Sequence, residues 1–160
     1  MSSKVAPLLV FGWGNPGRGD DALGPLLVEQ LAGHAQAHWP TGRLECLTDF
    51  QLQVEHALDL VGRERVLFVD AAIGLQTPFE VSAVVPAPVA GFTTHALAPE
   101  ALLQVYTELE RTEPPPCTLL AIRAQRFGLG EAPGAQALDD LAQALAWAMA
   151  WAQLPEEMLT

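Results

Sequence analysis

The sequence predicts an α/β fold: a three-layer sandwich whose five-stranded, mostly parallel sheet has one antiparallel strand and helices on both faces. Three observations lead to this prediction. Short continuous apolar runs, typical of buried strands, alternate with longer segments whose apolar residues recur at helical spacing. No helix fits between the third and fourth runs, so those two strands should be antiparallel. Half of the 160 residues are hydrophobic, which is enough for one compact domain over residues 1–160.

The first half of the chain is expected to form three strands and two helices. In order, these are a strand at 5–11, a helix at 22–34, a strand at 43–48, a helix at 52–61 and a strand at 65–70. Pro25 fits only in the first turn of its helix, which fixes where that helix begins. His34 and His38 lie around the end of this helix and are expected on the surface, whereas His56 lies inside the second helix and is expected to be structural.

The second half is expected to add two strands and two helices. In order, these are a strand at 79–85, a helix at 99–111, a strand at 117–124 and a long helix at 135–154. The strand at 79–85 should pair with the one before it as a hairpin. In the long helix, one apolar face is formed by Leu138, Leu141, Leu145 and Met149.

Composition excludes several classes of function. The formal net charge is −11, and the 8 Lys and Arg residues form no cluster, which argues against a nucleic-acid partner. No apolar run is long enough to span a membrane and no signal-peptide pattern is present, so we expect a cytoplasmic protein without a membrane partner. Cys46 and Cys117 lie inside apolar runs without metal-binding spacing and are expected to be reduced and buried.

The most informative stretch is the glycine-rich turn after the first strand. Residues 12–24 read Gly-Trp-Gly-Asn-Pro-Gly-Arg-Gly-Asp-Asp-Ala-Leu-Gly, which contains more glycines than a turn needs. The turn delivers two adjacent carboxylates, Asp20 and Asp21, to the start of the first helix. Free amides and the helix dipole would stabilise a carboxylate there, so capping of that helix is the ordinary structural explanation for the pair.

Polar side chains follow three strands at what should be one edge of the sheet. Asp20 and Asp21 follow the first strand, Asp70 closes the third, and His95 follows the fourth after a loop. In such a sheet the binding crevice lies at the carboxyl ends of the strands. Carboxylates and an imidazole meeting there suit a divalent cation such as zinc or nickel, or an acid–base pair. Each residue alone also has a structural explanation, so the prediction depends on their joint placement.

Two other functions can be read from the same turn. Gly12, Gly14 and Gly17 have the spacing of a dinucleotide-binding turn, which would make the chain a nucleotide-binding module. That turn needs the helix to begin within the glycines, whereas here residues 18–24 intervene and the two carboxylates would repel phosphates. Residues 12–17 also resemble the opening of peptidyl-tRNA hydrolases, but the catalytic histidine of that family is missing and the charge is wrong for tRNA.

With Asn15, Asp21 and Gly24 in place, the turn closely resembles the opening of the hydrogenase maturation endopeptidases. That family opens with a hydrophobic strand, Gly-x-Gly-Asn, an acidic pair and a nearby glycine. Its second motif, an apolar strand that ends in Asp-Ala before a glycine, is matched by residues 66–74. Its third motif, Ser/Thr-x-His before a helix, is matched by residues 93–95. The resemblance covers roughly residues 8–150 in order and spacing.

The resemblance implies an endopeptidase that removes the C-terminal extension of a nickel–iron hydrogenase large-subunit precursor after nickel insertion. Asp21, Asp70 and His95 would be both the catalytic residues and the ligands of nickel supplied by the precursor, and no organic cofactor is implied. The nickel would serve as the recognition element, so that an empty precursor is not cut. Amide hydrolysis would use the cation to polarise the carbonyl or activate water, or a carboxylate as general base.

The resemblance also implies contacts with the substrate chain. We assign Gly14, Asn15 and Asp20 to substrate binding, with the glycines leaving room for the partner's backbone. Two departures from the family bear on the site. The second acidic position, often glutamate in the family, is Asp21 here and has a shorter reach. Residues 49–52 replace a glycine-rich pair, so we expect contacts there to be specific to this chain's own partner.

Overall fold

Five strands form one mixed sheet in the computed structural model, which describes residues 5–88 and 97–153. Across the sheet the order is β2 (Leu44–Asp49), β1 (Leu8–Trp13), β3 (Arg65–Ile73), β5 (Cys117–Ala124) and β4 (Phe79–Val84). The pairs β1–β2, β1–β3 and β3–β5 are parallel, and β4–β5 is antiparallel. The predicted five-stranded, mostly parallel sheet with one antiparallel strand is therefore confirmed.

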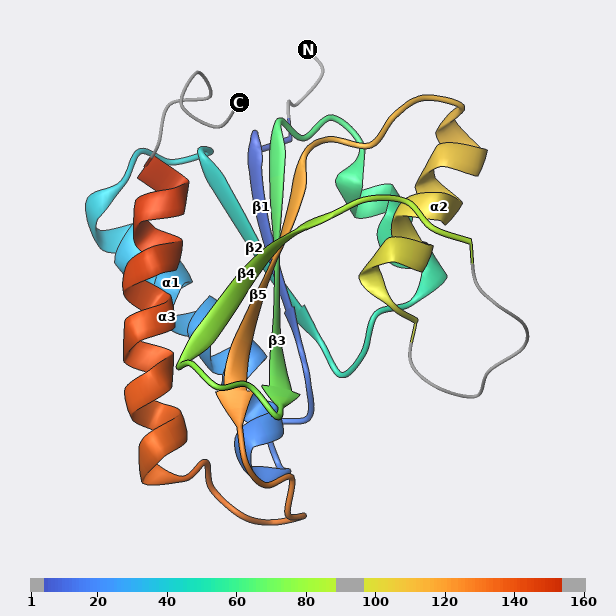
Figure 1. Cartoon of the computed structure of the whole chain (residues 1–160). Helices are drawn as coiled ribbons and strands as arrows, with labels where there is room; N and C mark the ends of the chain where they lie inside the picture. Colours follow the sequence, from blue (N-terminus) through green and yellow to red (C-terminus); the bar gives the residue numbers. More distant parts are fainter. Residues whose placement is uncertain (1–4, 89–96, 154–160) are drawn as a thin grey trace.

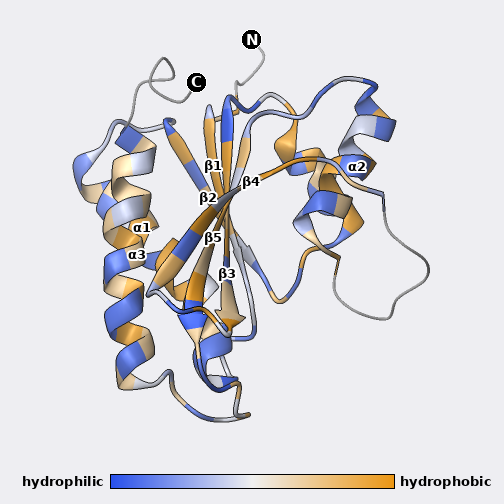
Figure 2. Cartoon of the chain, viewed as in Figure 1, coloured by the Kyte–Doolittle hydropathy of each residue, from blue (hydrophilic) through white to orange (hydrophobic). Residues whose placement is uncertain are grey.

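Helices cover both faces of this sheet (Figure 1). On one face lie α1 (Leu23–His38) and α3 (Ala135–Gln153); on the other lie α2 (Pro99–Glu110) and the 3-10 helix η2 (Val54–Leu60). Alternate residues of β1 enter the two cores, because successive side chains of a strand point to opposite faces. Leu8 and Val10 pack with α1 and α3, whereas Leu9 and Phe11 pack with α2 and η2. The central strands are accordingly apolar along their length (Figure 2).

The predicted hairpin between the third and fourth strands is wrong. β4 is antiparallel, but it pairs with β5, while β3 pairs with β1 on one side and with β5 on the other. The more apolar strand takes the central place: Leu120 and Ile122 of β5 are fully buried, whereas residues 80–83 of β4 are exposed. β4 therefore lies at the sheet edge, where residues 80–83 face water.

Three further expectations need correction. The segment predicted as a helix at 52–61 is the 3-10 helix η2, which buries only Ala57 and Leu60. β3 does not end at Asp70 but continues to Ile73, because β5 pairs with it that far. The buried face of α3 is not the predicted leucine face, since alanines let the helix lie close to the sheet. It consists chiefly of Ala137, Leu141, Ala144, Ala148, Trp151 and Ala152.

The two cysteines agree with expectation for Cys117 and in part for Cys46. Cys46 and Cys117 are free; Cys117 is buried and Cys46 is partly buried. Burial raises the pKa of the Cys46 thiol to about 11 and that of Cys117 to about 12, so neither is a reactive thiolate near neutral pH. Among the described residues, no helix has the length and apolar character needed to cross a membrane.

Candidate active site at the carboxyl edge of the sheet

The glycines of the turn allow the start of α1 to lie directly against the ends of β1 and β3. A Cβ atom on Gly12 would lie 2.6 Å from the Gly24 carbonyl oxygen, and one on Gly24 would lie 2.6 Å from the Trp13 carbonyl oxygen and 2.9 Å from that of Val69. Real Cβ atoms do not approach so closely. The space that we assigned to a partner's backbone is thus occupied at these positions by the chain's own backbone.

Gly14 brings Asp21 back against the end of β1. Its φ of +146° is accessible to glycine, and a Cβ atom there would overlap the backbone oxygen of Asp21. The Asn15 amide donates to Asp21 Oδ2 over 2.8 Å, and Asn15 Oδ1 accepts from the Gly17 amide over 2.8 Å. The Asn15 backbone amide and the lack of a side chain at Gly14 therefore fix the position of the Asp21 carboxylate.

Asp20 does not cap α1. The residue before that helix is Ala22, with no side-chain cap, and Asp20 lies in the 3-10 turn η1 (Gly19–Ala22). Its carboxylate is 3% exposed and accepts three backbone amides from the loop between β5 and α3. These come from Gln125 at 2.8 Å, Arg126 at 3.2 Å and Gly134 at 2.9 Å.

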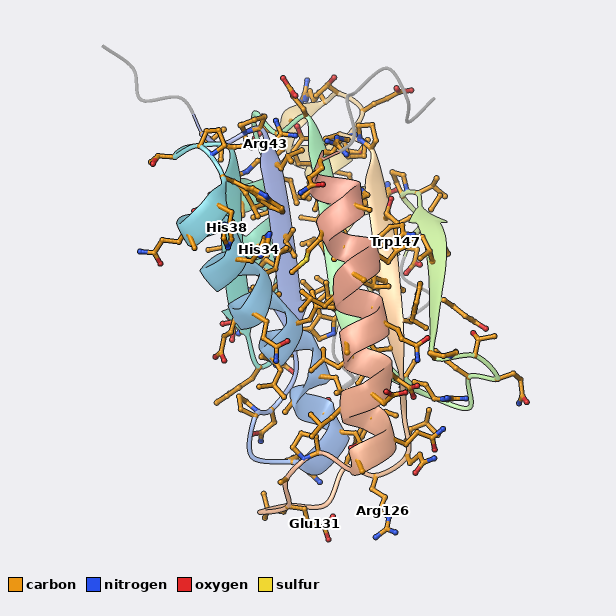
Figure 3. All side chains as sticks on the ribbon, turned by 90° about the vertical axis from the view of Figure 1, so that its left-hand side faces the viewer. His34, His38, Arg43, Arg126, Glu131 and Trp147 are labelled. Atoms are coloured by element: carbon orange, nitrogen blue, oxygen red, sulfur yellow. The ribbon has the colours of Figure 1, made fainter. Side chains whose placement is uncertain are left out.

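The pKa of Asp20 reflects this arrangement. Burial raises the pKa, but the three amides outweigh burial and hold it below the ordinary aspartate value. Two backbone hydrogen bonds also join the glycine-rich turn to the loop after β5: the Gly19 amide donates to the Glu131 carbonyl, and the Gly130 amide donates to the Gly17 carbonyl. Arg126 and Glu131 project from this loop at the lower end of the molecule (Figure 3). The geometry favours a structural role for Asp20 over the predicted substrate contact.

Asp70 lies beside Trp13 and Asp21, one residue beyond the last register pair between β1 and β3, Gly12 with Val69. Burial raises its pKa from the ordinary 3.8 to about 7, and the Asp21 charge adds to the increase. Two hydrogen bonds act in the opposite direction: the Ala71 amide donates to Oδ1 over 2.8 Å, and the Trp13 side chain donates to the carboxylate. Asp21 and Asp70 thus lie at the same edge of the sheet, close enough for their charges to interact.

His95 lies outside the described residues, so its predicted place beside the two carboxylates remains a prediction. Within residues 5–88 and 97–153, no group of three or more His, Cys, Asp or Glu side chains is arranged to hold a metal ion. The described part of the site is therefore a pair of carboxylates, which needs a further ligand from residues 89–96 or from a substrate to complete a cation site.

A surface cavity of about 230 Å³ borders Gly14. Phe50, which follows β2, is 69% exposed at this cavity and gives it an apolar wall. The neighbouring Asp49 is held by His56, whose Nε2 lies 3.1 Å from Asp49 Oδ2, and the Asp49 carbonyl accepts the Gly14 amide. The other residues that line the cavity are Pro16, Pro25, Glu29 and Thr48.

Sequence reasoning missed two parts of this edge. The sequence pattern places Trp13 only within the glycine motif, although a buried indole N–H needs an acceptor, and Asp70 is that acceptor. His56 was expected to be structural, and it is: its Nδ1 accepts the Gln53 amide and its other nitrogen contacts Asp49. The role of Asp49 in fixing Gly14 had no signal in the sequence.

Comparison with known proteins identifies the fold. The NiFe hydrogenase maturation protease HycI from Thermococcus kodakarensis KOD1 superposes with a TM-score of 0.69 over 96% of each chain, at 21% identity. The chain has the fold of the hydrogenase maturation proteases. The maturating endopeptidase HybD from E. coli gives a TM-score of 0.69 over 90% of each chain, at 20% identity. The hydrogenase 2 maturation peptidase from a Thaumarchaeota archaeon gives 0.63 over 92% of this chain and 99% of that one, at 19% identity.

The maturation-protease fold spans almost the whole chain in these superpositions, in agreement with the extent of the sequence resemblance. No protein-family model and no curated protein sequence matches the chain. The structure also weakens the nucleotide-binding alternative. α1 begins at Leu23, so η1, which carries Asp20 and Asp21, separates the Gly12–Gly17 turn from the helix along the chain, whereas a dinucleotide-binding turn leads directly into its helix.

Proposed function

We propose that this protein is an endopeptidase that removes the C-terminal extension of a nickel–iron hydrogenase large-subunit precursor after nickel insertion. One observation carries the proposal: Asp21 and Asp70 meet at the carboxyl edge of a fold shared with proteins named as hydrogenase maturation proteases. This is the edge at which open α/β sheets bind their ligands. The two carboxylates are held by the backbone and by Trp13, so they are pre-positioned before any substrate arrives.

A divalent cation fits this pair on physical grounds. Asp70 has a pKa near 7 because burial and the neighbouring Asp21 both disfavour its ionised form. A bound cation would offset both effects and displace the proton. Two carboxylate oxygens with the imidazole of His95 make a donor set suited to nickel or zinc, and they leave coordination positions for groups from the precursor. In our proposal the nickel belongs to the precursor, so binding tests whether the metal has been loaded.

The reaction is hydrolysis of one peptide bond: water adds to the carbonyl carbon, the C–N bond breaks, and the departing amine takes a proton. Nickel would polarise the carbonyl or lower the pKa of the attacking water. The chain's own residues hold and orient the reacting groups. Asn15 and Gly14 fix Asp21, and Trp13 and the Ala71 amide fix Asp70. A carboxyl group with a pKa near 7 is also suited to accept and return a proton at neutral pH.

We assign the cavity beside Gly14 to the polypeptide that flanks the cut. It adjoins the turn that orients Asp21, and its exposed Phe50 offers an apolar contact that the folded chain does not otherwise use. Phe50 belongs to the segment at 49–52 that departs from the family pattern. Its contact would therefore contribute to the choice of one precursor over another.

The deciding experiment is incubation with a nickel-loaded large-subunit precursor, followed by mass spectrometry of the precursor. We expect loss of one C-terminal peptide and no loss from a nickel-free precursor. Asp21→Asn, Asp70→Asn and His95→Ala should each abolish cutting, whereas Asp139→Asn, an exposed carboxylate on α3, should not. Equal cutting by Asp70→Asn, or no cutting of any loaded precursor encoded near this gene, would count against the proposal.

A further inference from the structure

We propose that His34 and His38 form a second metal site, a bidentate and exchangeable one for divalent cations such as Ni²⁺ or Cu²⁺. The two residues are four apart on α1 and therefore lie on the same side of the helix. Their rings lie next to each other (Figure 3), with centroids 4.6 Å apart and planes tilted by 42°. Among the described residues, neither ring has a hydrogen-bond partner, so the ring nitrogens are available as ligands.

The separation of the rings matches two adjacent positions around one cation. An imidazole nitrogen binds such metals at about 2.0–2.1 Å, which places each ring centre about 3.2 Å from the ion. If the two nitrogen–metal bonds meet at 90° at the ion, the ring centres are about 4.5 Å apart. The distance between the two ring centroids here is 4.6 Å. Right angles between neighbouring ligands are those of square-planar and octahedral ions, hence the choice of Cu²⁺ and Ni²⁺.

The surroundings favour a cation at this point. His38 lies in the last turn of α1, where the helix dipole attracts positive charge. The formal net charge of −11 adds a general attraction for cations. His38 is exposed and His34 partly exposed, so an ion can enter without rearrangement of the core. No third His, Cys, Asp or Glu ligand completes a cluster within the described chain, so water fills the remaining positions and the ion exchanges freely.

This site is separate from the candidate active site. Asp21 precedes the first turn of α1, whereas His34 lies eleven residues after Leu23, about 17 Å further along the helix axis at 1.5 Å per residue. Neither histidine contributes to the proposed peptide hydrolysis. The inference therefore does not depend on that function, and the two can fail independently.

Trp39 supplies a local reporter, because its ring lies 5.4 Å from the His34 ring in an edge-on arrangement. The test is titration of the intact protein with Cu²⁺ and with Ni²⁺, followed by calorimetry and, for Cu²⁺, by tryptophan fluorescence. The titrations use the double variant Asp70→Asn/His95→Ala as background. It lacks two ligands of the candidate active site, so the ions that calorimetry detects are bound elsewhere. In this background we expect one equivalent of each ion to bind and Cu²⁺ to quench fluorescence.

Three further variants decide the outcome. His34→Gln and His38→Gln should each weaken binding about ten-fold or more, because the second imidazole binds intramolecularly. Trp39→Phe should remove most of the quenching while leaving the calorimetric binding intact. Far-UV circular dichroism checks that each variant remains folded. Binding that is equally strong in His34→Gln and His38→Gln, or absent from the background variant at millimolar ion, would overturn the proposal.

Discussion

Asp70→Asn should stabilise the metal-free protein while abolishing the proposed activity. The pKa of Asp70 is about 7 in the folded chain, against an ordinary value of 3.8. Each pKa unit corresponds to about 1.4 kcal/mol, so the ionised carboxylate costs the folded state up to about 4 kcal/mol relative to the unfolded chain. Asparagine has nearly the same shape, keeps an oxygen for the Ala71 amide and carries no charge. We expect it to raise the free energy of unfolding by about 2–4 kcal/mol at pH 8.

The pH dependence has a defined sign. A carboxyl group with a raised folded-state pKa contributes stability while it is protonated, and this contribution is lost as pH rises from about 4 to about 7. The advantage of Asp70→Asn should therefore be close to zero at pH 4, grow with pH, and level off above pH 7. Urea unfolding of both proteins in chelator, at intervals from pH 4 to pH 9, measures this difference. A variant that is less stable at pH 8, or a difference that does not change with pH, would refute the reasoning.

The remaining predictions concern the turn, its loop and the cavity. Gly14→Ala should destabilise the chain by at least about 2 kcal/mol in urea unfolding, because φ is positive at Gly14 and a Cβ atom there would overlap Asp21. Gly33→Ala is the control: Gly33 lies in α1 with open space around it, so this substitution should stabilise the chain by about 1 kcal/mol. Asp20→Ala should lower the unfolding free energy by about 2–4 kcal/mol, because three backbone amides lose a buried charged acceptor. A change below about 0.5 kcal/mol, which is usual for surface substitutions, would contradict this. Phe50→Ala should raise KM for the precursor several-fold and leave kcat unchanged. Thermal stability should also be unchanged, since Phe50 is 69% exposed. An altered kcat with unchanged KM would show that the cavity does not bind the substrate.

Much of this architecture could be predicted from sequence because its signals are local. The strand at Cys117–Ala124 was located to the residue, and the meeting of Asp21 with Asp70 followed from the rule that parallel strands end at one edge. The helix at Pro99–Glu110 was predicted to within one residue of its end, because proline marks its first turn. These features depend on residues that are neighbours along the chain or on a topological rule.

The errors concern contacts between distant segments. Whether β4 pairs with β3 or with β5 depends on which strand gains most from burial on both faces, and no local pattern decides that. The role of Asp20 was misjudged for the same reason, since a carboxylate before a helix looks like a cap until the loop after β5 is placed against it. On α3, small alanines rather than leucines face the sheet, because close approach of the helix outweighs the larger apolar side chains.

The bonds made by Asp20 also bear on the order in which the protein folds. Its three amide partners lie 105, 106 and 114 residues later in the chain, so these contacts close very long loops. Such closures are entropically costly and tend to form only after the intervening strands have paired. During synthesis, the turn that carries Asp21 would be made early, but the hydrogen bonds of Asp20 could form only after the segment that follows β5 has been made. The protein would thus acquire its functional edge only when its chain is nearly complete.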